Sequence, residues 1–227
     1  MRLTYYGHSC FLVETTRARL LLDPYFTGNP VAPITADQVA CDFILASHAH
    51  SDHICDALAI ARRCSAPLIA NYEIAEYFGA QGIKTHGLNP GGGFDFPFGR
   101  VKLTPARHSS SLDENPRAPI YMGEACGILV FADGKALYHA GDTALFLDME
   151  LIGRAKLDVA LIPIGDNFTM GPDDALEALD LLRPKLAVPM HYNTWPVIKQ
   201  DAADFARRAG LQGHAVRPLR PGESLEF

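Results

Sequence analysis

Residues 42–53 read DFILASHAHSDH, an apolar run followed at once by a cluster of histidine and aspartate side chains. The apolar part, residues 42–46, has the length and composition of a buried strand. With the histidine and aspartate content of this chain, the pattern H-x-H-x-D-H arises by chance in about one chain per thousand. A buried strand that leads into this pattern indicates a metal site at the edge of a sheet. The defined positions of the pattern are His48, His50, Asp52 and His53.

The spacing of the motif allows it to supply two neighbouring ions. Alternate side chains of an extended chain point the same way, so His48 and His50 can bind one ion. Asp52 and His53 lie just past the turn and can bind a second ion beside the first. Neutral imidazole suits Zn²⁺, Fe²⁺ or Mn²⁺, and carboxylates add negative charge. A hydrogen-bonded polar turn is the alternative, but burying four polar side chains without a metal carries a large desolvation cost.

Each ion needs further ligands from distant parts of the sequence. Three candidates follow β-like runs and precede polar loops: His108 ends VKLTPARH, Asp142 lies in YHAGDT, and His191 ends LAVPMH. Taken alone, each would more often be an ordinary surface or core residue. Because the ends of neighbouring strands meet at one edge of a sheet, we expect all three to join the motif.

Strand-like and helical runs alternate along the chain. Runs rich in β-branched, aromatic and aliphatic residues predict strands at 3–6, 10–14, 19–22, 42–46, 67–70, 100–105, 158–164 and 186–190. Asp133-Gly134 predicts a hairpin between strands at 127–132 and 135–139. Helical spacing predicts helices at 54–64, 72–78, 172–182 and 200–209, whereas 24–30, 91–93 and 109–121 have loop composition. This mixture predicts an α/β fold with mixed sheets and outer helices, in one domain spanning residues 1–227.

Composition argues against several classes of protein. Hydrophobic residues make up 48% of the 227 residues, enough for a sizeable core. The net charge of -6 argues against broad binding to nucleic acid or an anionic membrane. No apolar run approaches the ~18 residues that a membrane span needs, and the N-terminal residues lack the features of a signal peptide. The 5 cysteines show no disulfide spacing, so we expect a cytoplasmic protein with reduced thiols.

Together, HAHSDH, RHSS, HAGDT and PMHYNT resemble the metallo-β-lactamase superfamily. The segments YYGHSCFLVE and PIGDNFTMGPDDA are similar to a group of metal-dependent hydrolases near the ascorbate-6-phosphate lactonases within it. The resemblance covers about residues 3–200, and HAHSDH is its most specific part. It implies a four-layer αβ/βα sandwich, in which two mixed sheets face each other, helices cover the outer faces, and the site lies at one edge.

The resemblance also implies a ligand set for two divalent ions, with Zn expected first and Mn or Fe as alternatives. It assigns His48, His50 and His108 to the first metal and Asp52, His53 and His191 to the second, with Asp142 bridging them. Two cations a few Å apart can share one water and lower its pKa, so that a bridging hydroxide attacks an electrophile. Asp52 and Asp142 are therefore the expected catalytic carboxylates. Asp52 would orient the hydroxide or take up a proton.

Several further residues are candidates around this site. Asp23, at the end of ARLLLD, could accept an N–H from a ligating histidine, or it could be a turn carboxylate. His8, His139, Asn167 and Tyr192 could line the site or serve as ordinary structural residues. Arg107 and Lys199 could bind an anionic group, although solvated surface charge is the simpler interpretation.

These features favour a hydrolase acting on an ester, lactone, thioester or phosphoester of a small molecule. A nuclease of the same superfamily is an alternative, but the acidic charge and the absence of a basic stripe argue against nucleic acid as a partner. Redox di-iron relatives resemble H-x-E-x-D-H, whereas position 50 is histidine here. A non-enzymatic metal-binding role is the remaining alternative. We expect no membrane partner, and a homo-oligomer is open on base rates alone.

Overall fold

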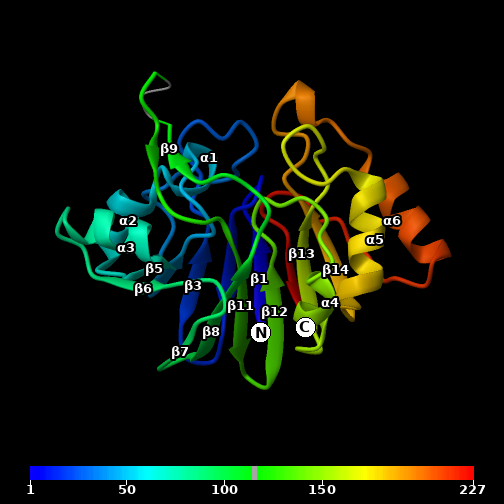
Figure 1. Ribbon diagram of the computed structural model, residues 1–227, viewed down its shortest axis with the longest axis horizontal. Coiled ribbons are helices and arrows are strands. Elements are labelled where there is room, and N and C mark those ends of the chain that lie inside the picture. Colours follow the sequence, from blue (N-terminus) through cyan, green and yellow to red (C-terminus); the bar gives the residue numbers. More distant parts are fainter. Residues whose placement is uncertain (114–116) are drawn as a thin grey trace.

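The computed structural model describes residues 1–113 and 117–227, which form two large mixed β-sheets with helices on their outer sides (Figure 1). The first sheet has the strand order β15-β1-β2-β3-β4-β5-β6 and the second β14-β13-β12-β11-β8-β7. The strands of the first sheet are β1 (Arg2–Tyr5), β2 (Phe11–Glu14), β3 (Arg19–Leu22), β4 (Phe43–Leu45), β5 (Leu68–Asn71), β6 (Thr85–Leu88) and β15 (Ser224–Glu226). Those of the second are β7 (Gly93–Phe96), β8 (Gly99–Pro105), β11 (Cys126–Ala132), β12 (Lys135–His139), β13 (Val159–Pro163) and β14 (Leu186–Met190).

The two sheets pack face to face through alternate residues of their strands. In β2, Phe11 and Val13 belong to a core cluster that also contains Ile128 and Val130 of β11. Leu12, between them, points the other way and joins a separate cluster beneath the helices of the first sheet. Because neighbouring side chains of a strand lie on opposite faces, each apolar strand buries both of its faces. The main core therefore lies between the sheets.

Helices cover the outer faces and complete four layers, as expected from the sequence. α2 (Ala57–Cys64) and α3 (Tyr72–Gly79) lie beside the first sheet, and α4 (Met149–Gly153), α5 (Pro172–Leu182) and α6 (Ala202–Leu211) beside the second (Figure 1). The sequence of α5 explains its bounds, because proline occupies its first turn together with two acidic residues. Arg183 then ends it in the left-handed region, at φ 49°. No helix among the described residues is long and apolar enough to span a membrane.

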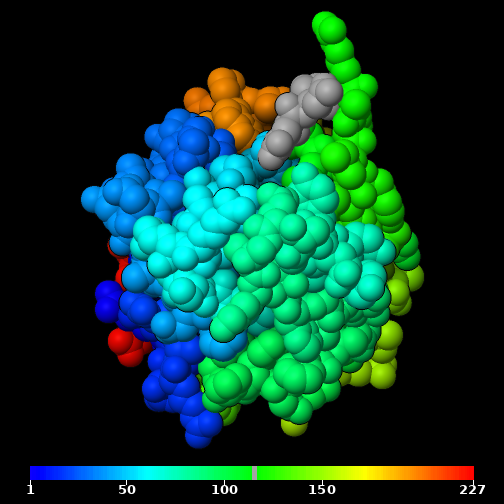
Figure 2. All heavy atoms as spheres, turned by 90° about the vertical axis from the view of Figure 1, so that its left-hand side faces the viewer, coloured from blue at the N-terminus to red at the C-terminus, as the bar shows by residue number. Residues whose placement is uncertain are grey.

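The structure differs from the sequence prediction at several segments. The helix expected over residues 54–64 is interrupted, because Asp56 separates α1 (Ser51–Ile54) from α2 and accepts hydrogen bonds from the backbone N–H groups of Phe26 and Thr27. Residues 109–121, expected as loop, contain the short strands β9 (Ser111–Leu112) and β10 (Ile120–Tyr121). Part of the green segment in this region projects at the top of Figure 2. Residues 114–116, which include Pro116, belong to this predicted loop and lie outside the described residues. Further elements among the described residues were not expected: β6, β7, α4, the short 3-10 helix Pro196–Ile198 and β15.

The strand directions bring the predicted ligands to one edge of the sandwich. β12, β13 and β14 are parallel, and β8 runs the same way as β12 because both are antiparallel to β11. Loops after β8, β12 and β14 therefore leave the second sheet at the same edge. The segment after β4 joins them there, since the backbone N–H of Cys126, at the start of β11, donates to the carbonyl of Ser47 at 2.9 Å.

Candidate metal centre

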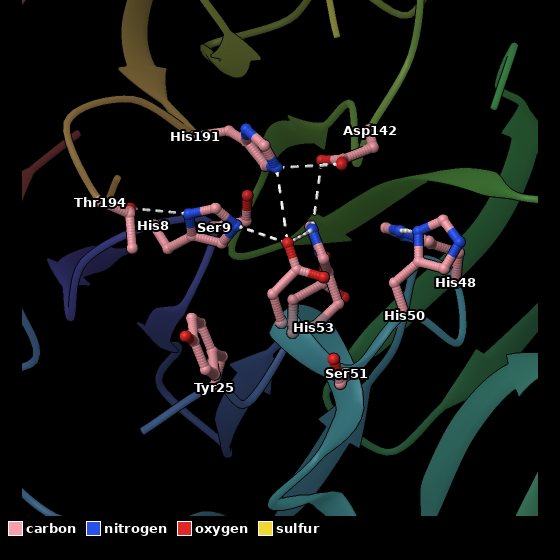
Figure 3. Close-up of polar contacts among 12 residues, drawn as sticks. His8, Ser9, Tyr25, His48, His50, Ser51, His53, Asp142, His191 and Thr194 are labelled. Carbon is pink, nitrogen blue, oxygen red and sulfur yellow. Dashed lines mark hydrogen bonds and ion pairs between the residues drawn. The ribbon is translucent and has the colours of Figure 1, made fainter. Parts of the chain in front are cut away.

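Three imidazoles converge at the end of β4. The Nε2 atom of His48 lies 3.0 Å from Nδ1 of His50 (Figure 3). Nε2 of His108 lies 3.3 Å from the same Nδ1 atom. The ring of His50 is nearly perpendicular to the other two. His108 reaches this position from the loop after β8, so residues 58 positions apart meet here. The ligand atoms of all three lie within 4.8 Å of one another, close enough to bind one ion.

A second group of ligand atoms lies beside the first and is linked to it by Asp142. Oδ2 of Asp142 lies 3.0 Å from Nε2 of His191, and Oδ1 lies 3.2 Å from Nε2 of His53. Asp52 completes this group, with its Oδ2 atom 3.7 Å from Nε2 of His191. The same Asp142 carboxylate is 3.6 Å from Nε2 of His108 in the first group. Asp142 therefore lies where a carboxylate shared by two ions would lie.

Several buried polar atoms in this region lack a hydrogen bond. Among the described residues they include His53 Nε2, Asp142 Oδ1 and both ring nitrogens of His191. Buried polar groups without a hydrogen bond are costly and rare in native proteins, yet here several of them face one another at ion-pair distance. Imidazole nitrogens and carboxylate oxygens are the ligands that Zn²⁺ and similar cations prefer. The donor set and its unpartnered atoms therefore fit divalent metal ions.

The electrostatics of the group also suit cations. Burial alone would raise the pKa of the Asp142 carboxyl, but His191 and His53 hold it well below its usual range. Burial and the neighbouring His53 lower the pKa of His48 well below its usual value, which keeps this imidazole neutral and able to bind a metal. Burial would lower the pKa of His53 too, but Asp142 and Asp52 raise it well above its usual value. The ionised carboxylates therefore create a negative potential here, which stabilises positive charge on an imidazole or on a bound cation.

Asp23 holds the ligand-bearing segment in place from behind. Its Oδ2 atom accepts hydrogen bonds from the hydroxyl of Ser47 at 2.6 Å and lies 2.7 Å from Nδ1 of His53. Its Oδ1 atom accepts from the backbone N–H of Ser47 at 2.7 Å. The side chain is fully buried. Asp23 thus lies next to His53, one of the predicted ligands.

His8 and His139 both lie at the site, on different sides of it. His8 is fully buried, with Nε2 3.0 Å from Oδ2 of Asp52 and Nδ1 2.8 Å from the hydroxyl of Thr194. Burial lowers the pKa of His8 to about 4, so its ring is neutral. His139 lies behind Asp23, 3.8 Å from its Oδ2 atom, and donates from Nε2 to the carbonyl of Ser9 at 2.9 Å. His8 therefore contacts the predicted ligand Asp52 directly. His139 lies beside Asp23, which in turn contacts the predicted ligand His53.

The site opens into a cavity of about 400 Å³. Neither Asn167 nor Tyr192 lines it, contrary to the positions considered for them. Asn167 is exposed, and Tyr192 is half-buried against the main core. Phe168, next to Asn167, and Trp195, three residues after Tyr192, line the cavity instead. Phe168 lies within the motif PIGDNFTMGPDDA, and Trp195 directly follows the motif PMHYNT. The lining residues are Tyr25, His50, Ser51, Asp52, His108, Ser109, Asp113, Asp142, Phe168, His191 and Trp195.

Gly165 packs closely against His191, which leaves no room for a side chain at position 165. A Cβ atom at Gly165 would lie 2.1 Å from the carbonyl oxygen of His191 and 3.3 Å from its Nδ1 atom. We expect Gly165→Ala to lower the free energy of unfolding by about 1–3 kcal/mol and to weaken metal binding. Thermal unfolding and metal content would measure both effects. As a control, Gly210→Ala in α6 meets no atom within 4 Å and should leave stability unchanged or slightly higher; equal behaviour of the two variants would contradict this prediction.

Comparison with known proteins identifies the family to which the chain belongs. Residues 18–192 match the family model described as "Beta-lactamase superfamily domain". The chain is 55% identical to a "UPF0173 metal-dependent hydrolase" of Opitutus terrae, over 100% of both chains. It is 40% identical to Igni18, described as a metallo hydrolase from Ignicoccus hospitalis, with a TM-score of 0.90 over 100% of this chain and 98% of that one.

A more distant structure shares the fold. The isothiocyanate hydrolase from Delia radicum gut bacteria is 20% identical, with a TM-score of 0.77 over 100% of this chain and 99% of that chain. The two relatives of high identity are matched over the whole of this chain. The chain belongs to the β-lactamase superfamily domain family and is a metal-dependent hydrolase with the metallo-β-lactamase fold.

Proposed function

We propose that this protein hydrolyses an ester, lactone, thioester or phosphoester of a small molecule with two divalent cations, of which Zn²⁺ is the first candidate. His48, His50 and His108 would hold one cation, and Asp52, His53 and His191 the other. The observation that supports this most is the position of Asp142, which lies within 3.6 Å of His108 and within 3.2 Å of His53. When bound, the cations supply Lewis-acid chemistry, activating water and stabilising negative charge on the electrophile.

The carboxylate of Asp52 is the group that would orient the attacking water. It lines the cavity, and its side chain is 21% exposed. Burial alone would raise its pKa, but His53, His191 and His8 together lower it. An ionised carboxylate accepts hydrogen bonds from water. His8 restricts its rotation through the 3.0 Å contact between Nε2 of His8 and Oδ2 of Asp52.

An activity panel with controlled metal content would test this proposal. The protein would be stripped with a chelator, reloaded separately with Zn²⁺ or Mn²⁺, and assayed against esters, lactones, thioesters, phosphomonoesters and phosphodiesters. We expect hydrolysis of at least one class by loaded protein only, with full activity at two metal ions per chain. Activity that persists after complete removal of metal, or full activity at one ion per chain, would contradict the proposal.

The acidic charge of -6 and the modest cavity support a small-molecule substrate rather than nucleic acid. A cytoplasmic location is proposed on the sequence features alone. A salt-dependent binding measurement with RNA would test the nuclease alternative, and we expect no binding at physiological ionic strength.

A further inference from the structure

Ser47, which directly precedes the HAHSDH motif, is fully buried and hydrogen-bonded at each of its polar atoms. Its backbone N–H donates to Oδ1 of Asp23 at 2.7 Å, and its carbonyl accepts from the backbone N–H of Cys126 at 2.9 Å. Its hydroxyl oxygen lies 2.6 Å from Oδ2 of Asp23 and 2.9 Å from Nδ1 of His48. Through Ser47, Asp23 is therefore linked to a member of the first group of proposed ligands, in addition to its direct contact with His53 in the second group.

The hydroxyl of Ser47 has a single proton, and the two neighbours of the hydroxyl decide where this proton points. Aspartate is ordinarily ionised at neutral pH, and an ionised carboxylate can only accept hydrogen bonds. The Ser47 proton therefore points to Oδ2 of Asp23. The 2.9 Å contact with His48 is then a hydrogen bond only if Nδ1 of His48 carries a proton and donates it to the Ser47 oxygen.

This arrangement places the lone pair of a neutral His48 ring on Nε2, the atom that converges with His50 and His108. Histidines that bind a metal ordinarily donate their other ring N–H to a carboxylate or another acceptor, which fixes the tautomer and the orientation of the ring. His53 follows the same pattern without an intermediary, because its Nδ1 atom lies 2.7 Å from the same Oδ2 atom of Asp23. A single carboxylate oxygen therefore orients one proposed ligand of each ion.

Gly141 packs against Ser47 from the second sheet. A Cβ atom at Gly141 would lie 2.8 Å from Cβ and 3.0 Å from Oγ of Ser47. Gly141 also has a φ of 60°, in the left-handed region that favours glycine. It precedes Asp142 in the HAGDT motif, so the segment that carries Asp142 lies directly against the serine. Such close packing leaves the Ser47 side chain few rotamers and holds its hydroxyl between Asp23 and His48.

We propose that Ser47 is a positioning residue for the first ion: its hydroxyl passes the orientation set by Asp23 to His48 and keeps the lone pair of His48 directed into the site. The effect on metal binding rests on the proposed function, whereas the tautomer of His48 is a property of the protein alone. Loss of the hydroxyl affects the two ions unequally, because the direct contact between Asp23 and His53 remains.

The tautomer of His48 can be measured in metal-free protein at neutral pH by nitrogen-15 NMR of the imidazole rings, because protonated and unprotonated ring nitrogens have well-separated resonances. In the wild-type protein we expect a neutral ring with its proton on Nδ1. In Ser47→Ala, Nδ1 has lost its acceptor, and we expect all or part of the population to carry the proton on Nε2 instead. A wild-type His48 without the Nδ1 proton, or a Ser47→Ala protein that keeps the wild-type tautomer throughout, would overturn the proposal.

Titration of the same labelled proteins with Zn²⁺, in competition with a chelator, then measures the two ions separately. The Nε2 resonance of His48 reports the first ion and that of His53 the second. We expect Ser47→Ala to weaken binding at His48 about 10- to 100-fold, the range found for partners of ligating histidines, and to leave binding at His53 within about threefold. A loss at His48 of less than about threefold, or an equally large loss at His53, would contradict the positioning role.

Ser110→Ala is the matched control, because Ser110 is also a buried serine beside the ligand-bearing segment. Its hydroxyl oxygen accepts from the backbone N–H of Ala49 at 3.2 Å, whereas the hydroxyl oxygen of Ser47 accepts from the ring of His48. We expect Ser110→Ala to keep the wild-type tautomer of His48 and its affinity for Zn²⁺ within about threefold. Thermal unfolding would show that both variants fold. If Ser110→Ala reproduces the effects of Ser47→Ala, a general loosening of the segment explains them and Ser47 has no specific role.

This inference and the proposed function fail in different ways. A single zinc ion per wild-type chain, together with the expected change of tautomer in Ser47→Ala, would contradict the two-ion hydrolase but support the orientation of His48 by Ser47. Two ions per chain with an unchanged tautomer in Ser47→Ala would overturn the role of Ser47 and leave the proposed function intact.

Discussion

Asp142→Asn should lower kcat/KM by about a thousandfold or more with any substrate, which corresponds to several kcal/mol of lost transition-state stabilisation. The physical reason is that Asp142 contacts both groups of proposed ligands, with His108 on one side and His53 and His191 on the other. Asparagine keeps the shape but removes the negative charge that two neighbouring cations need between them. Metal analysis of the purified variant should show fewer than two ions per chain.

The control for this variant is Asp148→Asn, because Asp148 is exposed and makes no capping hydrogen bond with its side chain. It should retain metal content and activity within about twofold, as most surface substitutions are nearly neutral. Thermal unfolding in the presence of a chelator would show whether Asp142→Asn still folds. If the folded Asp142→Asn protein keeps two ions per chain and full activity, the bridging position of Asp142 is wrong.

Asp23→Asn should weaken metal affinity about 10- to 100-fold although Asp23 lies behind the proposed ligands, because partners that orient ligating histidines have effects of this size. The carboxylate accepts from both Ser47 and His53, three hydrogen bonds in all within 2.7 Å. An asparagine amide can offer one carbonyl oxygen only, and its NH₂ group would face a donor. His53 would therefore lose its fixed orientation. Competition with a metal-sensitive dye would measure the affinity.

Asp42→Asn provides the comparison, since Asp42 is an exposed carboxylate that pairs with Arg19 just before β4. It should leave metal affinity unchanged. A loss of affinity shared by both variants would point to general damage near β4. An unchanged affinity in folded Asp23→Asn would show that Asp23 does not position His53.

The predicted ligand set could be gathered from the sequence because each member follows a strand end. His48, His108, Asp142 and His191 come after β4, β8, β12 and β14, and strand order alone brings such ends together. The structure places these residues in contact with the rest of the HAHSDH motif. The site residues that directly follow strands could therefore be identified from periodicity and residue type. Their role as metal ligands, the identity of the metal and the count of two remain proposals.

The substrate side of the cavity could not be predicted, because its direction depends on single backbone turns. His191 has a φ of 55°, in the left-handed region, so the alternation of the preceding strand stops there and Tyr192 packs against the core. Asp166 and Asn167 also have positive φ values, of 62° and 53°, and the cavity is lined by Phe168 instead. The periodicity of a sequence does not reveal such changes in the direction of the backbone.

The fold was predicted in its class but not in its smaller elements. α4 and β15 are 5 and 3 residues long and carry little local signal. The break between α1 and α2 depends on hydrogen bonds from Phe26 and Thr27 to Asp56, which only tertiary structure creates. Long-range contacts of this kind override local helical spacing. The single domain spanning residues 1–227 remains a prediction.

Anomalous diffraction from crystals grown with Zn²⁺ would test the central claim most directly, because it counts and locates metal ions independently of any substrate. We expect two peaks a few Å apart, one among His48, His50 and His108 and one among Asp52, His53 and His191, with Asp142 in contact with both. A single peak, or peaks bound by other residues, would contradict a two-ion centre at this edge of the sandwich.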